Sequence, residues 1–321
     1  MRILILLYHL QYVNAFLNYW NCVGFSKDID FTKPYKCNIG DIPLVLWKND
    51  TNILSTINIC KHLGSKLDKG WIDNNCLVCP YHGLKHNHKD SFGIVKEVDG
   101  KIWWNLNKTT TTKPPIIPFK NFETSYITID MNEDLPYCAY NSMDLNHPEY
   151  IHNTMFGFGS HNKPKEFNTY NFNDKVGISF QYHLKNSIKH INYDIKTKTK
   201  NSTYNFNMFQ YPSTAWSCVQ IGEKLSKMVI GVSMLPISPN KTRWFVTVRH
   251  NYMNDIIGRN IVKCLTYMIL FQDYEQFNRQ SSNIYLKNKY LLNKIIEHDE
   301  PIILLKDIFK KYKYPTIKDI L

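Results

Sequence analysis

The first third of the chain alternates short apolar runs with polar turns, which is typical of a β domain. Apolar runs at Ile42–Trp47 and Ile53–Ile59 flank a polar turn rich in Asn and Asp. Farther along, Ile94–Val98 and Ile102–Trp104 flank Asp99-Gly100, a dipeptide that favours a tight hairpin turn. We therefore expect this part of the chain to fold as short strands joined by turns.

A threonine-rich stretch with prolines, Lys108–Pro118, follows and is the predicted domain linker. Beyond it, the apolar pattern predicts one helix at about Asn141–Phe156 and a longer one at about Asn254–Gln280. Between these helices, alternating positions predict antiparallel strands over Glu166–Gln181, Lys189–Thr197, Tyr204–Gln210, Ala215–Ile221, Met228–Leu235 and Arg243–His250. The last forty residues predict further helical pieces.

Together these patterns predict an α+β protein with two domains. We expect an all-β domain over residues 18–108 and a second domain, with an antiparallel sheet and helices, over residues 109–321. The length of 321 residues is enough for two ordinary hydrophobic cores.

Composition and charge narrow the class of protein. The hydrophobic fraction of 43% and the aromatic fraction of 14% indicate a globular fold. The formal net charge is +12, but no basic cluster is interleaved with aromatic residues, so we expect no nucleic-acid partner. A Lys-, Asn- and Ile-rich composition explains this charge most simply. The alternative is a basic face that steers an acidic protein partner.

The cysteines and the N-terminus favour a cytoplasmic location. Eight cysteines in 321 residues are not the dense pattern of a secreted disulfide scaffold. The first seventeen residues are apolar but contain His9, Gln11 and Asn14, and this run is too short and too polar to span a bilayer. A signal peptide ending at Val13-Asn14-Ala15 is the less favoured alternative.

Four metal-ligating residues stand at a distinctive spacing: Cys60-x-His62, sixteen residues, then Cys79-x-x-His82. Two cysteines and two histidines are the ligand set of a Rieske [2Fe–2S] centre, in which sulfur binds one iron and imidazole the other. Each half of the motif follows a strand-like run, so we expect both halves on loops at strand ends. Because Cys76-x-x-Cys79 also matches half of a zinc site, a structural zinc is the alternative.

A second group of candidate ligands follows at Asp144, His147 and His152. Two histidines with a distant carboxylate form the facial triad that holds ferrous iron and leaves positions open. Asp144 and His147 share a face of the predicted helix, whereas His147 and His152 are about 140° apart on an ideal helix. Pro148 favours a break in the helix, and such a break brings both imidazoles to one metal.

The third ligand of this site has to come from elsewhere in the fold. Asp273 lies among apolar residues of the long C-terminal helix and is the candidate carboxylate. An ordinary solvated helix charge is the alternative interpretation of Asp273, as it is of Glu275, and the sequence pattern barely separates the two.

The two motifs and their surroundings resemble the Rieske-type non-haem iron oxygenases. The resemblance runs along nearly the whole chain, through CKHLGSKLDKGW, CPYHG, MDLNHPEYIHNTMFG and FQDYEQFNRQ. It implies an N-terminal Rieske domain (18–108) followed by a helix-grip catalytic domain (109–321). By position it implies a [2Fe–2S] cluster on Cys60, His62, Cys79 and His82, and a mononuclear Fe(II) on His147, His152 and Asp273.

The resemblance also implies how the two centres communicate. Asp144 matches a carboxylate that hydrogen-bonds His147 and, across a subunit boundary, the second cluster histidine, His82. Such a carboxylate orients the imidazoles and shortens the path for electrons. A homotrimer is implied, because in this family each cluster serves the iron of a neighbouring subunit.

The implied activity is reductive activation of O2, with a ferredoxin or flavin reductase as electron donor and a small organic molecule as substrate. The catalytic region looks closest to vanillate demethylase oxygenase and pheophorbide a oxygenase, so we expect hydroxylation or demethylation. Two rival classes are a non-catalytic Rieske electron-transfer protein and a zinc-binding structural protein. Candidates for the cavity lining, with core packing as the alternative for most, are Phe172, Phe180, Tyr204, Phe206, Phe209 and Trp216.

Overall fold

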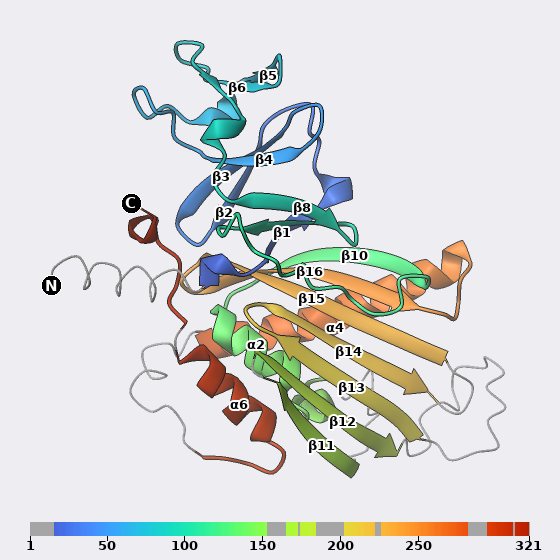
Figure 1. The fold of residues 1–321 in the computed structure, drawn as a ribbon. Coiled ribbons are helices and arrows are strands. Elements are labelled where there is room, and N and C mark those ends of the chain that lie inside the picture. The colour runs from blue at the N-terminus through green and yellow to red at the C-terminus, as the bar shows by residue number, and fades with distance from the viewer. Residues whose placement is uncertain are drawn as a thin grey trace, which may run out of the picture. The chain divides into compact units, whose positions relative to one another are not determined.

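The chain forms two compact units, which we describe separately (Figure 1). Unit 1 comprises the described residues up to Ile116, Met234–Pro239 and those within Lys311–Leu321, and unit 2 those within Ile117–Ser233 and Asn240–Lys310. The predicted domain boundary between residues 108 and 109 stays a prediction. The computed structural model describes residues 16–152, 165–172, 174–183, 202–221, 226–281, 294–310 and 312–320.

Unit 1 contains three small antiparallel sheets, with strand orders β1-β9-β8, β2-β3-β4 and β5-β6-β7. The predicted hairpin is confirmed, since Val98 pairs with Lys101 across Asp99-Gly100. The strands are β1 (Asn21–Phe25), β2 (Tyr35–Ile39), β3 (Ile42–Lys48), β4 (Ile53–Ile57), β5 (Trp71–Asp73), β6 (Cys76–Val78), β7 (Lys85–His86), β8 (Ile94–Val98) and β9 (Lys101–Asn105). Single turns of 3-10 helix lie at Phe16–Asn18, Ser26–Asp28, Leu67–Lys69, His88–Asp90 and Ile317–Asp319.

The core of unit 1 holds the two candidate cluster cysteines. Trp47 is fully buried in it and donates its indole N–H to the hydroxyl of Thr56 at 3.0 Å. The ring therefore buries its apolar area without leaving a buried donor unpaired. Cys60 and Cys79 pack in the same cluster of side chains and are 3% and 1% exposed. Each follows the end of a strand, β4 or β6, as predicted.

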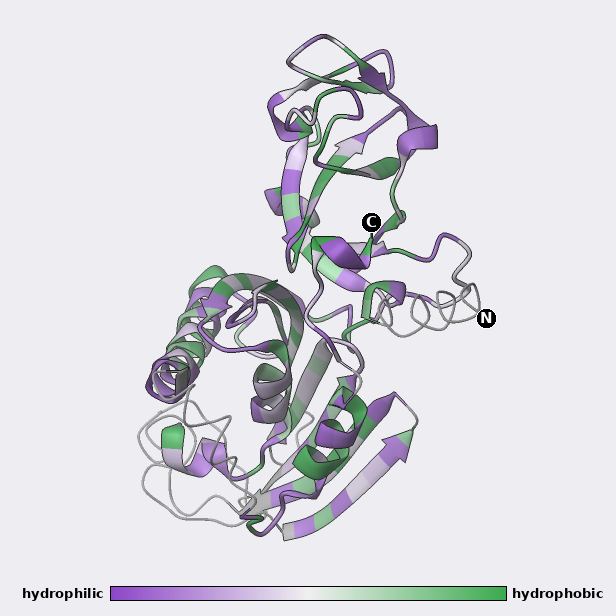
Figure 2. Ribbon diagram, turned by 90° about the vertical axis from the view of Figure 1, so that its left-hand side faces the viewer, coloured by the Kyte–Doolittle hydropathy of each residue, from purple (hydrophilic) through white to green (hydrophobic). Residues whose placement is uncertain are grey.

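Unit 2 is built on one seven-stranded antiparallel sheet with the order β10-β16-β15-β14-β13-β12-β11. Its strands are β10 (Glu123–Met131), β11 (Lys165–Phe172), β12 (Lys175–His183), β13 (Ser202–Gln210), β14 (Thr214–Ile221), β15 (Ser226–Ser238) and β16 (Lys241–His250). Figure 2 shows hydrophobic and hydrophilic residues interspersed along these strands, as expected for a sheet with one packed face.

The predicted strands of this region are confirmed with two differences. The run Glu166–Gln181 is two strands, β11 and β12, and Lys175 pairs with Phe172 where the chain turns. Strand β10 was not predicted, because its many Thr, Ser and Asp residues give a weak apolar signal. The predicted strand Lys189–Thr197 lies outside the described residues.

Helices α2 (Leu135–Met143), α4 (Ile256–Ser281) and α6 (Glu300–Phe309) lie along the sheet (Figure 1), and the short helix α3 (His147–Ile151) packs against α4. Helix α2 contacts β13, β14 and β16, and α6 contacts α2, β11 and β12. Phe309 of α6 packs against Phe209 of β13 with the rings tilted by 51° and their centroids 5.7 Å apart. The predicted helix at about Asn254–Gln280 is α4, and the predicted α+β class is confirmed.

Within the described part of the chain, no helix has both the length and the apolar content needed to cross a membrane.

Candidate metal centres and substrate cavity

The two half-motifs of unit 1 adopt the same turn. In each loop the cysteine N–H donates to the carbonyl five residues later, and a glycine N–H donates back to the cysteine carbonyl. These bonds are Cys60 to Ser65 at 2.8 Å and Gly64 to Cys60 at 2.9 Å in the first loop, and Cys79 to Leu84 at 2.9 Å and Gly83 to Cys79 at 3.0 Å in the second. The main chain alone therefore closes each loop within six residues.

A left-handed glycine completes each turn. Gly64 has φ of +75° and Gly83 has φ of +71°, a region that costs residues with a Cβ atom about 1–2 kcal/mol. No heavy atom lies within 4 Å of the position that a Cβ would take at either glycine. Backbone conformation, and not lack of space, is therefore what favours glycine here.

Sulfur and imidazole donors of the two loops lie in different environments. The cysteine sulfurs are buried, whereas His62 and His82 are exposed and their ring centroids are 4.9 Å apart. The Cys60 sulfur accepts backbone N–H groups of His62 and Leu63. This arrangement presents the imidazoles to solvent and holds the sulfurs against the core.

The two thiols lie within hydrogen-bonding reach of each other, and their pKa values move in opposite directions. Burial, reinforced by the neighbouring Cys79, raises the pKa of Cys60. Burial also disfavours the Cys79 thiolate, but hydrogen bonds from Tyr81 and from other groups outweigh it and lower the pKa of Cys79. Hydrogen bonds to sulfur stabilise the thiolate, which is the form that binds metal.

These donors fit a two-iron cluster better than a single zinc ion. Donors around one tetrahedral zinc lie within about 4 Å of one another. Among the described residues, the one group in which three candidate ligand atoms lie within 4.8 Å of one another is His147, His152 and Asp273. No such group contains Cys60 or Cys76, so the donors of unit 1 are spread too widely for the zinc alternative.

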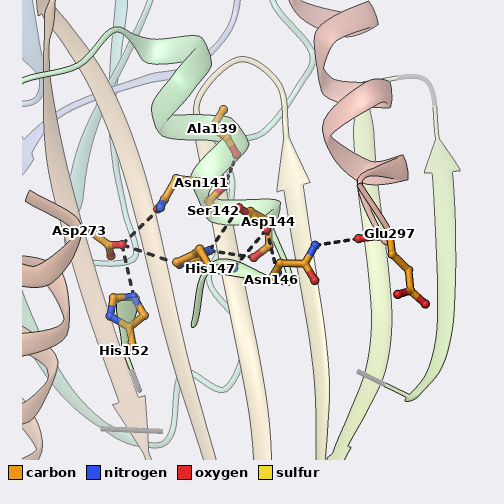
Figure 3. Close-up of polar contacts among 9 residues, drawn as sticks. All are labelled: Ala139, Asn141, Ser142, Asp144, Asn146, His147, His152, Asp273 and Glu297. Carbon is orange, nitrogen blue, oxygen red and sulfur yellow. Dashed lines mark hydrogen bonds and ion pairs between the residues drawn. The ribbon is translucent and has the colours of Figure 1, made fainter. Parts of the chain in front are cut away.

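In unit 2 the structure brings together the three residues predicted as the facial triad (Figure 3). His147 is the first residue of α3, His152 follows its last residue, and Asp273 lies on α4. Asp273 Oδ1 is 3.3 Å from His152 Nε2 and 3.8 Å from His147 Nε2. Asp273 is 5% exposed, so its interpretation as a solvated helix charge is wrong.

The helix predicted at about Asn141–Phe156, with a break at Pro148, is wrong in detail. Helix α2 ends at Met143, and α3 starts at His147 with Pro148 in its first turn. Proline is tolerated there because the first N–H groups of a helix have no intrahelical partner. His152 lies just beyond the end of α3 with non-helical dihedral angles, so the ideal separation of about 140° from His147 does not apply.

Hydrogen bonds fix which nitrogen of each imidazole faces the metal position. His147 Nδ1 lies 3.0 Å from the carbonyl oxygen of Asp144, and His152 Nδ1 lies 2.9 Å from Oε1 of Gln272. Both oxygens accept, so each Nδ1 carries the proton and each Nε2 keeps its lone pair. This tautomer is the one that can ligate a metal beside Asp273, and the donor set fits ferrous iron.

The carboxylate of Asp144 accepts backbone N–H groups at the start of α3. Its Oδ1 accepts the N–H of Asn146 at 2.8 Å and of His147 at 3.3 Å, while its Oδ2 is 4.0 Å from His147 Nδ1. The hydrogen bond of Asp144 to the His147 ring is therefore made by its carbonyl and not by its carboxylate.

The pKa values of the two histidines are shifted in opposite directions. Burial lowers the pKa of His147 despite the nearby carboxylates of Asp273 and Asp144. Burial also disfavours the charged form of His152, but its hydrogen bonds to Asp273 and Gln272 outweigh this and raise its pKa.

Two residues of this site were missed at the sequence level. Gln272 accepts from His152, and Asn141 donates its amide N–H to Asp273 Oδ1 at 3.3 Å. Gln272 stands directly before Asp273 in the sequence, which is the single signal that pointed to it. Asn141 carried none, because only the fold brings its side chain to Asp273, 132 residues further along the chain.

A cavity of about 230 Å³ opens beside the triad, between the sheet and the helices α2, α3 and α4. Of the aromatic residues proposed as lining, Phe180 and Trp216 do line it. Tyr204 and Phe206 border a separate hollow instead, and Phe172 is 54% exposed.

Comparisons with known proteins identify one domain of this chain and several relatives. The family model "Rieske [2Fe-2S] domain" matches residues 19–99. The chain is 28% identical over 163 residues to the oxygenase component of dicamba O-demethylase from Stenotrophomonas maltophilia, covering 42% of this chain and 47% of the relative. It is 22% identical over 188 residues to chloroplastic pheophorbide a oxygenase from Oryza sativa subsp. japonica, covering 47% and 35%. The chain thus spans less than half the length of these relatives.

Solved structures match over more of the chain. Dicamba monooxygenase bound to 3,6-dichlorosalicylic acid aligns with a TM-score of 0.78 at 15% identity, covering 92% of this chain and 96% of that one. NdmA of Pseudomonas putida CBB5 with caffeine aligns with a TM-score of 0.74 at 16% identity, covering 92% and 90%. The match over residues 19–99 shows that the chain contains a Rieske [2Fe–2S] domain. The chain is related to dicamba O-demethylase and pheophorbide a oxygenase and shares the fold of dicamba monooxygenase.

Proposed function

We propose that this chain is the terminal oxygenase of a multicomponent system, and that it uses O2 and electrons from a ferredoxin or flavin reductase to hydroxylate or demethylate a small organic molecule. The observation that carries the proposal is the convergence of two imidazole Nε2 atoms and the Asp273 carboxylate at the edge of an apolar cavity. An oxygenase needs a metal position that a substrate can reach, and this arrangement provides one.

The proposed cluster ligands are Cys60, His62, Cys79 and His82, and the proposed ligands of the mononuclear iron are His147, His152 and Asp273. When bound, the cluster supplies single electrons and the ferrous iron supplies the position at which O2 is reduced. The chain's own residues orient the donors: Gln272 holds the His152 ring, and Asn141 holds the Asp273 carboxylate.

Asp144 is proposed to link the two centres. Its carboxylate lies at the start of α3, next to His147, and borders the cavity. In the homotrimer that we propose, this carboxylate hydrogen-bonds His82 of the partner subunit. Asp144 then contacts both imidazoles, that of His147 through its carbonyl and that of the partner's His82 through its carboxylate, and one residue joins the two centres by a short path for electrons.

A non-catalytic Rieske electron carrier is the main rival. A carrier has no need for three converging donors beside a cavity, so a buried triad of this kind counts against it.

Iron content of a His147→Ala variant tests the catalytic proposal. We expect the variant to lose about one iron per chain, while its visible absorption and the EPR signal of the reduced cluster stay unchanged. Glu149→Gln is the matched control, because Glu149 also borders the cavity but is not a proposed ligand. Unchanged iron content in His147→Ala contradicts the proposal.

Single-turnover kinetics of an Asp144→Asn variant test the proposed link. Both metals should remain bound, but oxidation of the reduced cluster on mixing with O2 and substrate should slow by at least tenfold. Cluster oxidation at the wild-type rate would rule out a bridging role for the carboxylate.

A further inference from the structure

One amide that faces the cavity is buried with half of its hydrogen-bonding capacity unused. Asn207 of β13 is 7% exposed and lines the cavity. Its Oδ1 accepts the hydroxyl of Ser217, the residue directly opposite on β14, at 2.6 Å. Among the described residues, its Nδ2 has no hydrogen-bond partner.

The bond from Ser217 decides what this amide offers to a ligand. Because Oδ1 is engaged, the group left for the cavity is the NH2, which donates and does not accept. A ligand that displaces water from the cavity without offering an acceptor leaves this donor unpaired, which is unfavourable, and a ligand oxygen placed against it avoids that cost. The cavity therefore selects for an acceptor oxygen at this point.

The charges around the cavity act against anionic ligands. Asp144, Glu149 and Asp273 border it, and no Lys or Arg is among its described lining residues. Three carboxylates leave the lining negative even beside one divalent cation. Burying a further carboxylate there is costly, because an unpaired charge in an apolar site loses its hydration without a compensating partner.

The volume limits the size of the ligand. A dry apolar cavity of about 150 Å³ holds benzene. This cavity measures about 230 Å³, and its sheet side is mainly apolar, with residues such as Val219, Ile230 and Val232. That space suits one substituted ring or two fused rings.

We propose that the substrate is an uncharged molecule of one or two rings, and that a carbonyl or ether oxygen on it accepts a hydrogen bond from Asn207 Nδ2. This inference rests on the oxygenase function proposed above and names the substrate class of the same site. Asn207 thereby acts as a specificity-determining residue at the sheet side of the cavity, across from the triad.

Three planar probes of closely similar shape test the proposal: acetophenone, benzoate and isopropenylbenzene. Their affinities are measured by isothermal titration calorimetry on the full-length, iron-loaded protein, oxidised and without reductant, so that no turnover occurs. We expect acetophenone to bind at least tenfold more tightly than benzoate. Asn207→Leu should weaken acetophenone about five- to tenfold, which is the loss of one buried hydrogen bond, and should leave isopropenylbenzene within about twofold.

Asn171→Leu is the matched control, because it makes the same change on an exposed position of β11 and should alter no affinity. Benzoate binding as tightly as acetophenone, an unchanged acetophenone affinity in Asn207→Leu, or the binding of none of the probes would each overturn the inference. Because calorimetry needs no catalysis, these outcomes are independent of the iron content of His147→Ala, which tests the oxygenase function itself.

Discussion

The two candidate metal centres are held in different ways. In unit 1, each pair of donors lies on a loop that its own main chain closes within six residues, twice with the same hydrogen bonds. In unit 2, Asp273 comes from a helix more than a hundred residues after His147, and side chains such as Gln272 and Asn141 set the geometry. A locally closed site depends on a few turns, whereas the second site depends on how helices pack.

The two centres also differ in how deeply their candidate ligand side chains are buried. The imidazoles of the unit 1 loops are exposed, while His152 and Asp273 are 2% and 5% exposed. Exposed imidazoles suit exchange of electrons with another protein group, and a buried triad suits chemistry away from bulk water. We therefore expect substitutions at the two centres to have separable effects.

The largest effect should follow from Cys79→Ala. We expect complete loss of the visible absorption and of the EPR signal of the cluster, because one iron loses a thiolate ligand. The mononuclear site should keep about one iron per chain, measured after anaerobic reconstitution. Loss of both irons would show that the two centres are not separable.

Cys76→Ala is the control for this substitution. Cys76 is half-buried on β6, three residues before Cys79, and belongs to no converging donor group among the described residues. The variant should keep the full absorption of the cluster. Loss of this absorption in Cys76→Ala would instead show that Cys76 is needed to hold the cluster.

A smaller effect is expected from Gln272→Leu, which removes the hydrogen bond that orients His152. Such partners of metal-ligating histidines are worth about 10–100-fold in metal affinity. Affinity for Fe(II), measured by anaerobic competition with a chelator, should fall by about that factor while the cluster spectrum stays unchanged. Gln276→Leu, one turn further along α4, should leave the affinity at the wild-type value.

The sequence predicts the ligands of the unit 1 centre better than those of the unit 2 centre. The spacing of Cys60, His62, Cys79 and His82 is visible because each half-motif is a complete local structure. Asp273 was named as a candidate but could not be separated from Glu275 by pattern alone. Only the packing of α4 against α3 shows that one carboxylate is buried beside the histidines.

Prediction of the strands and helices from the sequence meets a similar limit. Strands with clear alternation, such as β13, were predicted within a few residues. Strand β10 was missed because its apolar signal is weak, and only its pairing with β16 shows that it is a strand. The start of α3 was also missed, since the break falls between Met143 and His147, before the proline, where the Asp144 carboxylate accepts backbone N–H groups. Asn207 gave no signal, because its role follows from its cavity and from Ser217 on the next strand.

The smallest expected effect is the loss of stability when glycine is replaced in the two cluster loops of unit 1, which adopt the same turn. Gly64→Ala and Gly83→Ala should each destabilise the protein by about 1–2 kcal/mol, because a residue with a Cβ atom is placed in left-handed backbone while no atom clashes with it. Urea unfolding of the cluster-loaded protein, followed by the cluster absorption, measures both losses. Equal losses would show that the loops match in energy as well as in geometry.

Substitution of the same glycines by asparagine distinguishes backbone strain from steric clash as the cause of the lost stability. Asn adopts left-handed backbone more readily than Ala, although its side chain is larger. Gly83→Asn should therefore lose less stability than Gly83→Ala if the cost arises from φ of +71°. A larger loss of stability in the Asn variant would mean that lack of space around the loop, and not its backbone conformation, requires glycine. The two loops would then need separate explanations.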